Sequence, residues 1–377
     1  MRILYASCRY DPFDRDAGSG VDFNMYEAFQ QNGVTLSTIG PFKDQRSLLA
    51  QVYRKAHRLF SHKLTAKFSE AYLRKCAQIV DETAGKEKPD AIFTHNLIPL
   101  VYSRSRIPVI YKTDAILSRM HEQWPTYSRF EYHRMLRWER KALRRASLVI
   151  TVSDWARQAL AEDYRIPEDR MLVRPIPSSL PAEVIPVALE DKPISPTDLH
   201  LLSVAKDFNL KGIDISIAIT RMLRAKGINA QLRVVGQSGD NTDGVDFMGL
   251  YKKSDPQMLR DYASQYQWAH LLIHPARYEA AGIVCSEAAA FGVPTITNAV
   301  GGLSTTVNDG VSGIVLPRGS AVENYVAAIE GLLQDPQKYQ SLRSSSRARY
   351  EQILNWRSMT ADILTAFASL KVNKEYG

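Results

Sequence analysis

Short apolar runs alternate with longer amphipathic stretches along this chain, and the pattern occurs in both halves. In the first half, five runs rich in β-branched residues have the length of buried strands: residues 2–7, 34–39, 90–95, 108–113 and 147–152. In the second half, six runs have the same character: residues 199–205, 230–236, 245–249, 269–275, 293–298 and 313–317. Strands that alternate with helical stretches are typical of parallel sheets, so the pattern predicts an α/β fold.

Two of the intervening stretches show clear helical periodicity. In residues 20–33, one predicted helix face carries the side chains of Val21, Met25, Ala28 and Phe29. In residues 212–227, the apolar stripe consists of Ile215, Ile219, Met222 and Leu223. Gly33 and Gly227 follow these stripes and are expected to end the helices, since glycine readily adopts the left-handed conformation found there.

A proline-rich segment separates the two halves. Residues 174–200 contain Pro175, Pro177, Pro181, Pro186, Pro193 and Pro196. Proline lacks a backbone N–H and disfavours helices and central strands, so we expect a linker with the domain boundary between Ser178 and Asp198. The predicted domains, 1–180 and 198–355, are Rossmann-like, doubly wound sheets. Ligands bind such sheets at the carboxyl ends of their strands, so a cleft is expected there.

The composition mainly excludes structural features such as disulfides and membrane-spanning segments. The chain has 377 residues, of which 45% are hydrophobic and 23% charged, as in an ordinary folded protein. Its three cysteines, Cys8, Cys76 and Cys285, are too far apart for a disulfide framework or a CxxC metal pair and fit a reducing compartment. The first apolar run is too short for a signal peptide, and no run is long enough to span a membrane. A cytoplasmic location is therefore expected.

The positive charge is concentrated in the first half. Residues 1–180 hold 29 Lys and Arg against 20 Asp and Glu, whereas residues 181–377 hold 19 against 20. A basic surface attracts phosphates, nucleic acid or anionic lipid. Two predicted helices, 53–68 and 129–145, mix basic and aromatic residues. We interpret them either as solvated helix faces or as a docking surface for the inner face of a membrane.

The stretch HPARYEAAGIVCSEAAAFGVP, residues 274–294, carries the candidate chemistry. Glu279 and Glu287 lie eight positions apart and flank small or apolar residues, among them Ala281, Gly282, Ile283 and Val284. A helix predicted to begin at Gly282 would offer free backbone N–H groups to a phosphate. Glu279 could then accept hydrogen bonds from sugar hydroxyls, and Glu287 from those of a ribose. The alternative is a helix-start acid followed by a solvated face.

This stretch and its surroundings resemble the family 4 retaining glycosyltransferases, which have the GT-B fold. The resemblance rests on the two glutamates with seven residues between them, on Gly292-Val293-Pro294 and on Gly301-Gly302. Lys206 and Lys211 resemble the basic pair with which the family holds the donor diphosphate, with lysine at Lys206 in place of the usual arginine. The segments around them imply further donor-site positions at Ala205, Gly236, Gly249 and Leu250. Residues 355–367 resemble the closing helix, about 356–377, that crosses back onto the first domain.

The chain departs from the family pattern at three places. Many relatives have a His-Asp pair at the end of a first-domain strand, whereas this chain has Thr113 followed by Asp114. Many have a glutamate three residues after the Gly-Gly pair, where this chain has Thr305. The N-terminal glycine loop is shifted, which leaves open whether Gly18 or Gly20 has the family's role. These departures affect sugar specificity and acceptor geometry rather than the fold.

The resemblance implies transfer of a sugar from a nucleotide diphosphate sugar, with UDP the expected nucleotide, to an acceptor hydroxyl with retention of configuration. The acceptor would be a saccharide or a lipid-linked molecule in polysaccharide, exopolysaccharide or glycolipid assembly. No metal and no cofactor are expected, because Lys206, Lys211 and the helix start would stabilise the leaving diphosphate. Glu279 would hold sugar hydroxyls and stabilise positive charge near the anomeric carbon. Retention would then arise from front-face substitution, without a carboxylate nucleophile.

Other residues and other functions stay open at this stage. His95 is expected to face the cleft and contact acceptor or donor sugar, or simply to bond to backbone. Arg277 is expected to line the pocket, or to be an exposed loop residue. One alternative function is another GT-B enzyme, such as a sugar-nucleotide epimerase or hydrolase. A non-enzymatic binder of anionic polymers is the other, although no nucleic-acid-binding motif is present, so no nucleic acid partner is expected.

Overall fold

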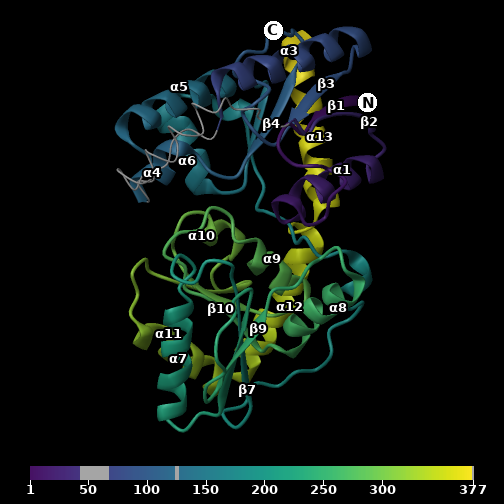
Figure 1. Cartoon of the computed structure of the whole chain (residues 1–377). Coiled ribbons are helices and arrows are strands. Elements are labelled where there is room, and N and C mark those ends of the chain that lie inside the picture. The colour runs from purple at the N-terminus through teal and green to yellow at the C-terminus, as the bar shows by residue number, and fades with distance from the viewer. Residues whose placement is uncertain (43–67, 124–126, 376–377) are drawn as a thin grey trace. The chain divides into compact units, whose positions relative to one another are not determined.

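The computed structural model describes residues 1–42, 68–123 and 127–375. The chain divides into two compact units, one formed by Met1–Arg174 with Thr360–Gly377 and the other by Pro175–Met359. Each unit contains one six-stranded parallel sheet with helices packed against it (Figure 1). The predicted α/β fold is confirmed.

The first unit has the strand order β2-β1-β3-β4-β5-β6. Its strands are β1 (Arg2–Ala6), β2 (Thr35–Ile39), β3 (Ala91–Thr94), β4 (Val109–Thr113), β5 (Leu148–Thr151) and β6 (Met171–Val173). Its described helices are α1 (Val21–Gln31), α3 (Glu70–Glu87), α4 (Leu117–Gln123), α5 (Arg129–Arg145), α6 (Asp154–Tyr164) and most of α13 (Trp356–Glu375). Short 3₁₀ turns lie at Ala17–Gly20 and Glu168–Arg170.

The second unit has the strand order β12-β11-β10-β7-β8-β9. Its strands are β7 (Leu199–Val204), β8 (Ala230–Val235), β9 (Val245–Gly249), β10 (Leu271–His274), β11 (Thr295–Asn298) and β12 (Gly313–Leu316). Its helices are α7 (Ile213–Ala225), α8 (Pro256–Trp268), α9 (Ile283–Ala290), α10 (Leu303–Thr306), α11 (Val322–Gln334) and α12 (Pro336–Gln352). A 3₁₀ turn, Ala182–Val184, lies in the segment that enters the unit.

All eleven predicted strands are present, with ends within two residues of the prediction. Only β6 was missed among the described strands, because a three-residue edge strand with partly buried side chains lacks a readable apolar run. The α1 face predicted from Val21, Met25, Ala28 and Phe29 is buried.

The apolar stripe predicted for α7 is partly wrong. Ile219 and Leu223 are buried, but Ile215 and Met222 are only partly buried. The helix instead turns Ser216 and Thr220 into the core, where each hydroxyl can hydrogen-bond to a carbonyl oxygen one turn earlier. Periodicity alone did not reveal these positions, because a hydroxyl satisfied by its own helix can be buried like an apolar group.

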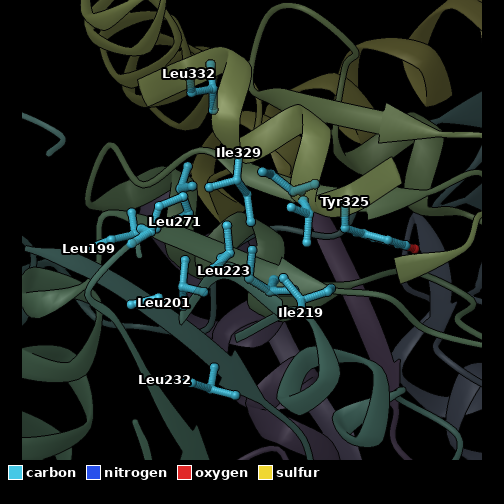
Figure 2. Close-up of a cluster of buried hydrophobic side chains, with 14 of the residues drawn as sticks. Leu199, Leu201, Ile219, Leu223, Leu232, Leu271, Tyr325, Ile329 and Leu332 are labelled. Carbon is cyan, nitrogen blue, oxygen red and sulfur yellow. The ribbon is translucent and has the colours of Figure 1, made fainter. Parts of the chain in front are cut away.

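Apolar clusters cover both faces of the second sheet. On one face, α7 and α11 pack against the strands through residues such as Ile219, Leu223 and Ile329 (Figure 2). On the other face, α8 and α9 share a second cluster that includes Leu259, Tyr262, Tyr266, Cys285 and Ala288. Because all strands are parallel, the loops before α7, α8 and α9 all start at the carboxyl edge of this sheet.

The proline-rich segment is not a free linker. Leu180 and Ile185 are buried in the same cluster as α8, and the Trp356 indole donates a hydrogen bond to the Ser178 carbonyl oxygen at 2.7 Å. The boundary between the units therefore lies at Arg174–Pro175, a few residues before the predicted range. Prolines deny this segment a regular element, but the apolar residues between them still pack on the second unit.

Helix α13 belongs to both units along its length. It begins at Trp356, and residues from Thr360 onward belong to the first unit. There Ile363 and Phe367 are buried, and Asn32 donates a side-chain hydrogen bond to the Thr360 hydroxyl at 2.7 Å. This segment is therefore part of the fold of the first unit, although it follows the second unit in the chain.

Candidate functional site

The start of helix α9 is the centre of the candidate site in the second unit. Its N-cap residue, Gly282, has φ +77°. A Cβ atom there would lie 2.8 Å from a side-chain carbon of Leu303, so this position favours glycine on both counts. The first backbone N–H groups of a helix have no partner within it, which makes Ile283 and Val284 available as donors to an anion.

Glu279 lies just before α9 and is held by two basic side chains. Its Oε2 accepts a hydrogen bond from Lys211 Nζ at 2.7 Å and lies 3.3 Å from His274 Nε2. Burial alone would raise the pKa of Glu279, but the hydrogen bond with His274 and the charge of Lys211 outweigh it and hold the pKa well below its usual range. The side chain remains 15% exposed, so Glu279 is an ionised carboxylate that a ligand can reach.

Backbone packing also fixes Glu279. Gly302 N–H donates to the Glu279 carbonyl oxygen at 3.2 Å. Gly301 has φ +55°, and a Cβ atom on it would lie 1.9 Å from the same oxygen. Ala281 N lies 3.4 Å from Glu279 Oε1, and the Thr306 hydroxyl donates to the Ala281 carbonyl oxygen at 2.5 Å. The Gly-Gly pair thus allows a second loop to press against the loop that carries Glu279.

Glu287 lies in the second turn of α9 and is fully buried. Its Oε1 accepts a hydrogen bond from Lys253 Nζ at 2.5 Å, and its Oε2 accepts from the hydroxyls of Tyr262 at 2.6 Å and Tyr266 at 2.8 Å. The carboxylate has no exposed surface, and three protein donors occupy it. The contact with ribose hydroxyls expected for Glu287 stays a prediction.

The two lysines expected to hold a diphosphate lie in different environments. Lys206 follows β7 and is exposed, and no ion pair is recorded for it within the described residues. Lys211 is 22% exposed and donates to both Glu279 and the Tyr278 carbonyl oxygen. Lys206 is therefore the cation of this pair whose charge is not already balanced by a carboxylate.

The predicted positions Ala205 and Gly236 meet at the carboxyl edge of the sheet. Gly236 has φ +92°, and a Cβ atom on it would lie 2.5 Å from the Ala205 carbonyl oxygen. The Gln237 side chain donates to that oxygen at 3.1 Å. The backbones at Ala205 and Gly236 therefore approach each other closely.

Three further predicted residues lie at the end of β9 or in loops at this edge. Gly249 ends β9 with φ +70°, and Leu250 after it is 57% exposed. Arg277 forms two hydrogen bonds with Asp214, at 2.8 and 2.6 Å, and one with the Asn209 carbonyl oxygen. Arg277 is therefore engaged in a salt bridge with the first turn of α7.

A second polar cluster lies at the carboxyl edge of the first sheet. His95, which follows β3, has Nε2 3.0 Å from Asp114 Oδ2 and Nδ1 3.4 Å from Asp22 Oδ2. The buried Lys112 ammonium donates to Asp114, and the Tyr5 hydroxyl donates to Asp22 at 2.9 Å. The structure thus brings the predicted residues His95 and Asp114 together with three groups that were not predicted.

The charges of this cluster keep His95 protonated. Burial and the charge of Lys112 lower the pKa of His95, but Asp114 and Asp22 outweigh them and raise it to about 9. Burial would raise the pKa of Asp114, whereas Lys112 and His95 hold it well below its usual range. At neutral pH, His95 is therefore an imidazolium between two carboxylates. In this form both ring nitrogens donate hydrogen bonds.

The remaining predicted residues of the first unit lie near this edge. Thr113 ends β4, is largely buried, and donates its hydroxyl hydrogen bond to the Ala115 carbonyl oxygen at 3.1 Å. Gly18, Ser19 and Gly20 are consecutive left-handed residues, with φ of 57°, 62° and 76°. Both glycines take part in the turn into α1, and the geometry does not single out one of them.

The partners of the predicted acids are what sequence reasoning missed. They are His274, Lys253, Tyr262 and Tyr266 in the second unit, and Asp22, Lys112 and Tyr5 in the first. Two signals could have found some of them. Lys112 interrupts an otherwise apolar strand, and Tyr262 and Tyr266 are four residues apart, hence on one face of α8.

Within residues 1–42, 68–123 and 127–375, no set of three or more His, Cys, Asp or Glu residues is arranged to hold a metal ion. No helix of this described part is long and apolar enough to cross a membrane.

Helix α5 corresponds to the predicted basic segment 129–145, whereas the predicted helix 53–68 lies outside the described residues except for Phe68. The two acids of α5, Glu131 and Glu139, are buried. The exposed residues of α5 are Arg129, Phe130, His133, Arg137, Arg140, Lys141 and Arg144. Its outer face is therefore basic, with an exposed aromatic ring near its start.

Comparison with protein families gives two matches that together span most of the chain. Residues 23–176 match the model described as Glycosyltransferase Family 4, and residues 186–349 match the model described as Glycosyl transferases group 1. A D-inositol 3-phosphate glycosyltransferase of Mycobacterium marinum is 30% identical over 213 residues, which are 53% of this chain and 41% of that protein. The chain thus spans less than half the length of this curated relative in the alignment.

Solved structures resemble the chain over nearly its whole length. Sucrose-phosphate synthase from Thermosynechococcus elongatus has a TM-score of 0.69 at 20% identity, covering 99% of this chain and 100% of that one. Anabaena HepE, solved in complex with UDP-glucose, has a TM-score of 0.63 at 17% identity, covering 98% and 100%. At these identities the likeness concerns the fold, and it confirms the expected GT-B class.

Proposed function

This chain is a family 4 glycosyltransferase, and from that membership we propose that it transfers a sugar from a nucleoside diphosphate sugar to an acceptor hydroxyl. The observation that carries the proposal is the arrangement at the start of α9. An ionised, reachable carboxylate at Glu279 lies beside free helix N–H groups at one end of the second sheet. The Glu279 carboxylate suits the hydroxyls and the developing positive charge of a sugar. The helix N–H groups suit a phosphate.

The diphosphate leaving group would be stabilised by backbone donors of α9 and by Lys206. Lys206 is exposed, and within the described residues no carboxylate pairs with it. Lys211 supports the same function indirectly, because it keeps Glu279 ionised. A lysine is a point charge rather than the planar fork of an arginine, so contacts at Lys206 would be less directional than those of the family's usual arginine. This set of groups would work without a metal ion.

Retention of configuration would follow from front-face substitution. Glu279 is already bonded to Lys211 and lies 3.3 Å from His274. Such a restrained carboxylate, with its pKa held low, suits electrostatic support of an oxocarbenium-like carbon better than nucleophilic attack. The acceptor proton would pass to the departing phosphate oxygen.

UDP-hexose is the donor that we propose. The support is that HepE, which shares the fold over 98% of this chain, was solved with UDP-glucose. We propose a saccharide or lipid-linked acceptor in polysaccharide or glycolipid assembly, bound in part by the His95 cluster of the first unit. The basic outer face of α5 would hold the enzyme at the inner surface of a membrane.

Calorimetry with purified protein tests the donor site. Titration of UDP, GDP and ADP in the presence of EDTA should show binding of at least one nucleotide, with UDP the tightest. Lack of binding by all three would refute the donor-site assignment, and binding that returns only on addition of Mg²⁺ or Mn²⁺ would refute metal independence. Product analysis with UDP-glucose, with and without candidate acceptors, separates a transferase from an epimerase or hydrolase.

A further inference from the structure

The loop that carries Glu279 is held from one side by helix α10 and the glycine before it. Gly302 N–H donates to the Glu279 carbonyl oxygen at 3.2 Å, and the Thr306 hydroxyl donates to the Ala281 carbonyl oxygen at 2.5 Å. Thr306 is 1% exposed, so solvent has little access to its hydrogen bond. One segment thus binds two carbonyl oxygens of the loop, which restrains the backbone between Glu279 and Gly282.

Helix α10 depends on other elements for its own position. It has only four residues, Leu303–Thr306, and a helix of a single turn is not stable by itself in water. The buried Leu303 side chain packs beneath Gly282, since a Cβ atom there would lie 2.8 Å from it. The last carbonyl oxygens of a helix have no partner within it. The end of α10 therefore needs donors from another element.

Arg349 of helix α12 supplies these donors. Its Nη2 donates to the Thr305 carbonyl oxygen at 2.6 Å, and its Nε donates to the Thr306 carbonyl oxygen at 3.3 Å. A guanidinium is planar and presents several N–H groups at fixed angles, so it can bind two neighbouring acceptors at once. Helix α12 has 17 residues and buries Tyr339 and Leu342 in the core of the second unit. A long, well-packed helix thus anchors a short one.

These contacts lead from α12 to a carboxylate that a ligand can reach. Ala281, which Thr306 binds, is two residues from Glu279, whose side chain is 15% exposed. Lys211 and His274 restrain the carboxylate itself, whereas α10 restrains the backbone from which it projects. A shift of about 1 Å at a group that contacts the reacting centre can lower a rate by orders of magnitude. The backbone contacts therefore matter for what Glu279 can do.

We propose that Thr306 and Arg349 are positioning residues of this enzyme, which act on the donor sugar through the backbone of Glu279. The Thr306 hydroxyl fixes the loop, and Arg349 fixes the helix that carries this hydroxyl. Without them, the Glu279 carboxylate would be displaced from the sugar hydroxyls, while the groups that bind the nucleotide stay in place. This inference rests on the proposed function, since it requires that Glu279 contact the sugar of a nucleoside diphosphate sugar.

Calorimetry tests the inference with three pairs of probes: UDP-glucose and UDP, GDP-mannose and GDP, and ADP-glucose and ADP. The pair whose nucleotide sugar wild-type protein binds most tightly is used for all variants. Thr306→Val removes the hydroxyl but keeps the shape of the side chain. It should weaken binding of the nucleotide sugar by about 5-fold and change the affinity for the free nucleotide by less than about 2-fold.

Conservative variants distinguish positioning from mere stabilisation. Thr306→Ser keeps the hydroxyl and should bind the nucleotide sugar within about 2-fold of the wild-type affinity. Arg349→Met should behave like Thr306→Val, and Arg349→Lys, which keeps a charged donor, should recover part of the loss. If either Thr306→Val or Arg349→Met fails to fold, the variants of the other residue decide the matter.

Thr220→Val and Arg347→Met are the matched controls. Thr220 is a buried threonine whose hydroxyl also donates to a carbonyl oxygen, that of Ser216 on α7. Arg347 lies on α12 and also donates to two carbonyl oxygens, those of Pro186 and Ala290. Both control variants should lower the melting temperature and leave the affinity for the nucleotide sugar unchanged.

A double-mutant cycle tests whether the effect passes through Glu279. Glu279→Ala removes the carboxylate, so a displacement of its backbone no longer moves a sugar-binding group. In the Glu279→Ala background, Thr306→Val and Arg349→Met should each weaken binding of the nucleotide sugar by less than about 2-fold. A purely structural effect would persist in this background.

Three results would overturn the inference alone, with wild-type protein still binding a nucleotide sugar. They are an unchanged affinity for the nucleotide sugar in folded Thr306→Val, equal losses for the nucleotide sugar and the free nucleotide, and an undiminished loss in the Glu279→Ala background. Failure of wild-type protein to bind any of the three nucleotide sugars would instead overturn the proposed function, and this inference with it.

Discussion

Two glutamates eight positions apart end up in opposite environments, and their neighbours cause the difference. Glu279 precedes α9 and keeps 15% of its side-chain surface exposed, while Glu287, one and a half turns inside the helix, keeps none. Lys211 and His274 hold the first, and Lys253 with two tyrosines holds the second. A ligand can therefore reach Glu279 directly, whereas Glu287 is enclosed by its protein partners.

Glu279→Gln tests the direct role. The change keeps the size of the side chain but removes the charge that would stabilise an oxocarbenium-like carbon. We expect turnover to fall by about 10²-fold or more, with UDP affinity changed far less. Initial rates, UDP affinity and melting temperature should be measured on one preparation.

A matched control for this variant is Asp214→Asn. Asp214 is also an acid beside a helix start at this edge, but it is 44% exposed and pairs with Arg277. The Asp214→Asn variant should change the free energy of unfolding by at most about 1 kcal/mol and leave turnover intact. If Glu279→Gln behaves like this control, Glu279 is only a helix-start acid.

Sequence alone could locate both glutamates but not their partners. Each acid is recognisable from its position relative to a strand end, a small-residue stretch and a glycine. His274 meets Glu279 through the path of the loop that follows β10, and Lys253 meets Glu287 through the packing of the loop after β9 near α9. No helix or strand pattern encodes either contact. The same holds for His95, which meets Asp22 and Asp114 from different elements.

At the scale of elements, the strands were predictable because fully buried parallel strands are continuous apolar runs. The loops between them were less predictable, since their paths depend on close backbone contacts. Gly301 is the sharpest case: its φ is +55°, and the space where a Cβ atom would lie is filled by the Glu279 carbonyl oxygen. A helix or strand pattern carries no information about such a contact.

Gly301→Ala should therefore disturb both folding and activity. The added methyl group would force apart the loops that carry Gly301 and Glu279. We expect a loss of about 2 kcal/mol or more in the free energy of unfolding, together with a clear fall in turnover, measured by urea unfolding and initial rates.

Gly310→Ala is the matched control for that variant. Gly310 also has a positive φ, +69°, but nothing lies within 4 Å of the position of a Cβ atom. Gly310→Ala should lower the free energy of unfolding only by what a left-handed backbone costs alanine, about 1–2 kcal/mol, and should preserve turnover. Equal effects of the two substitutions on turnover would show that the contact with Glu279 does not matter.

At the scale of the whole molecule, charge is divided unevenly. The positive excess lies in residues 1–180, and α5 concentrates it by burying its two acids and exposing its cations. Each Lys or Arg near an anionic bilayer contributes about 1 kcal/mol to binding at moderate ionic strength. The sequence could indicate this helix but not the inward direction of its acids.

Vesicle sedimentation tests the proposed membrane contact. Wild-type protein should sediment with vesicles that contain phosphatidylserine and not with pure phosphatidylcholine, and salt should release it. The triple variant Arg137→Glu, Arg140→Glu, Arg144→Glu should lose at least about 10-fold in affinity. A control with the same charge change on exposed residues of the second unit, Arg260→Glu, Arg318→Glu, Lys338→Glu, should keep it. Equal losses in both would show that net charge, not α5, causes binding.

The path of α13 has a consequence for the synthesis of this protein. The ribosome makes residues 1–174 first, but the first unit also requires Ile363 and Phe367, which are buried in it. Those residues emerge only after the entire second unit has been translated. Until then, the apolar surface that α13 covers on the first unit stays exposed, while the second unit can already fold. The second unit would thus be completed before the first, the reverse of the usual N-to-C order. Chaperones that bind nascent chains would find their target in the half that is made first.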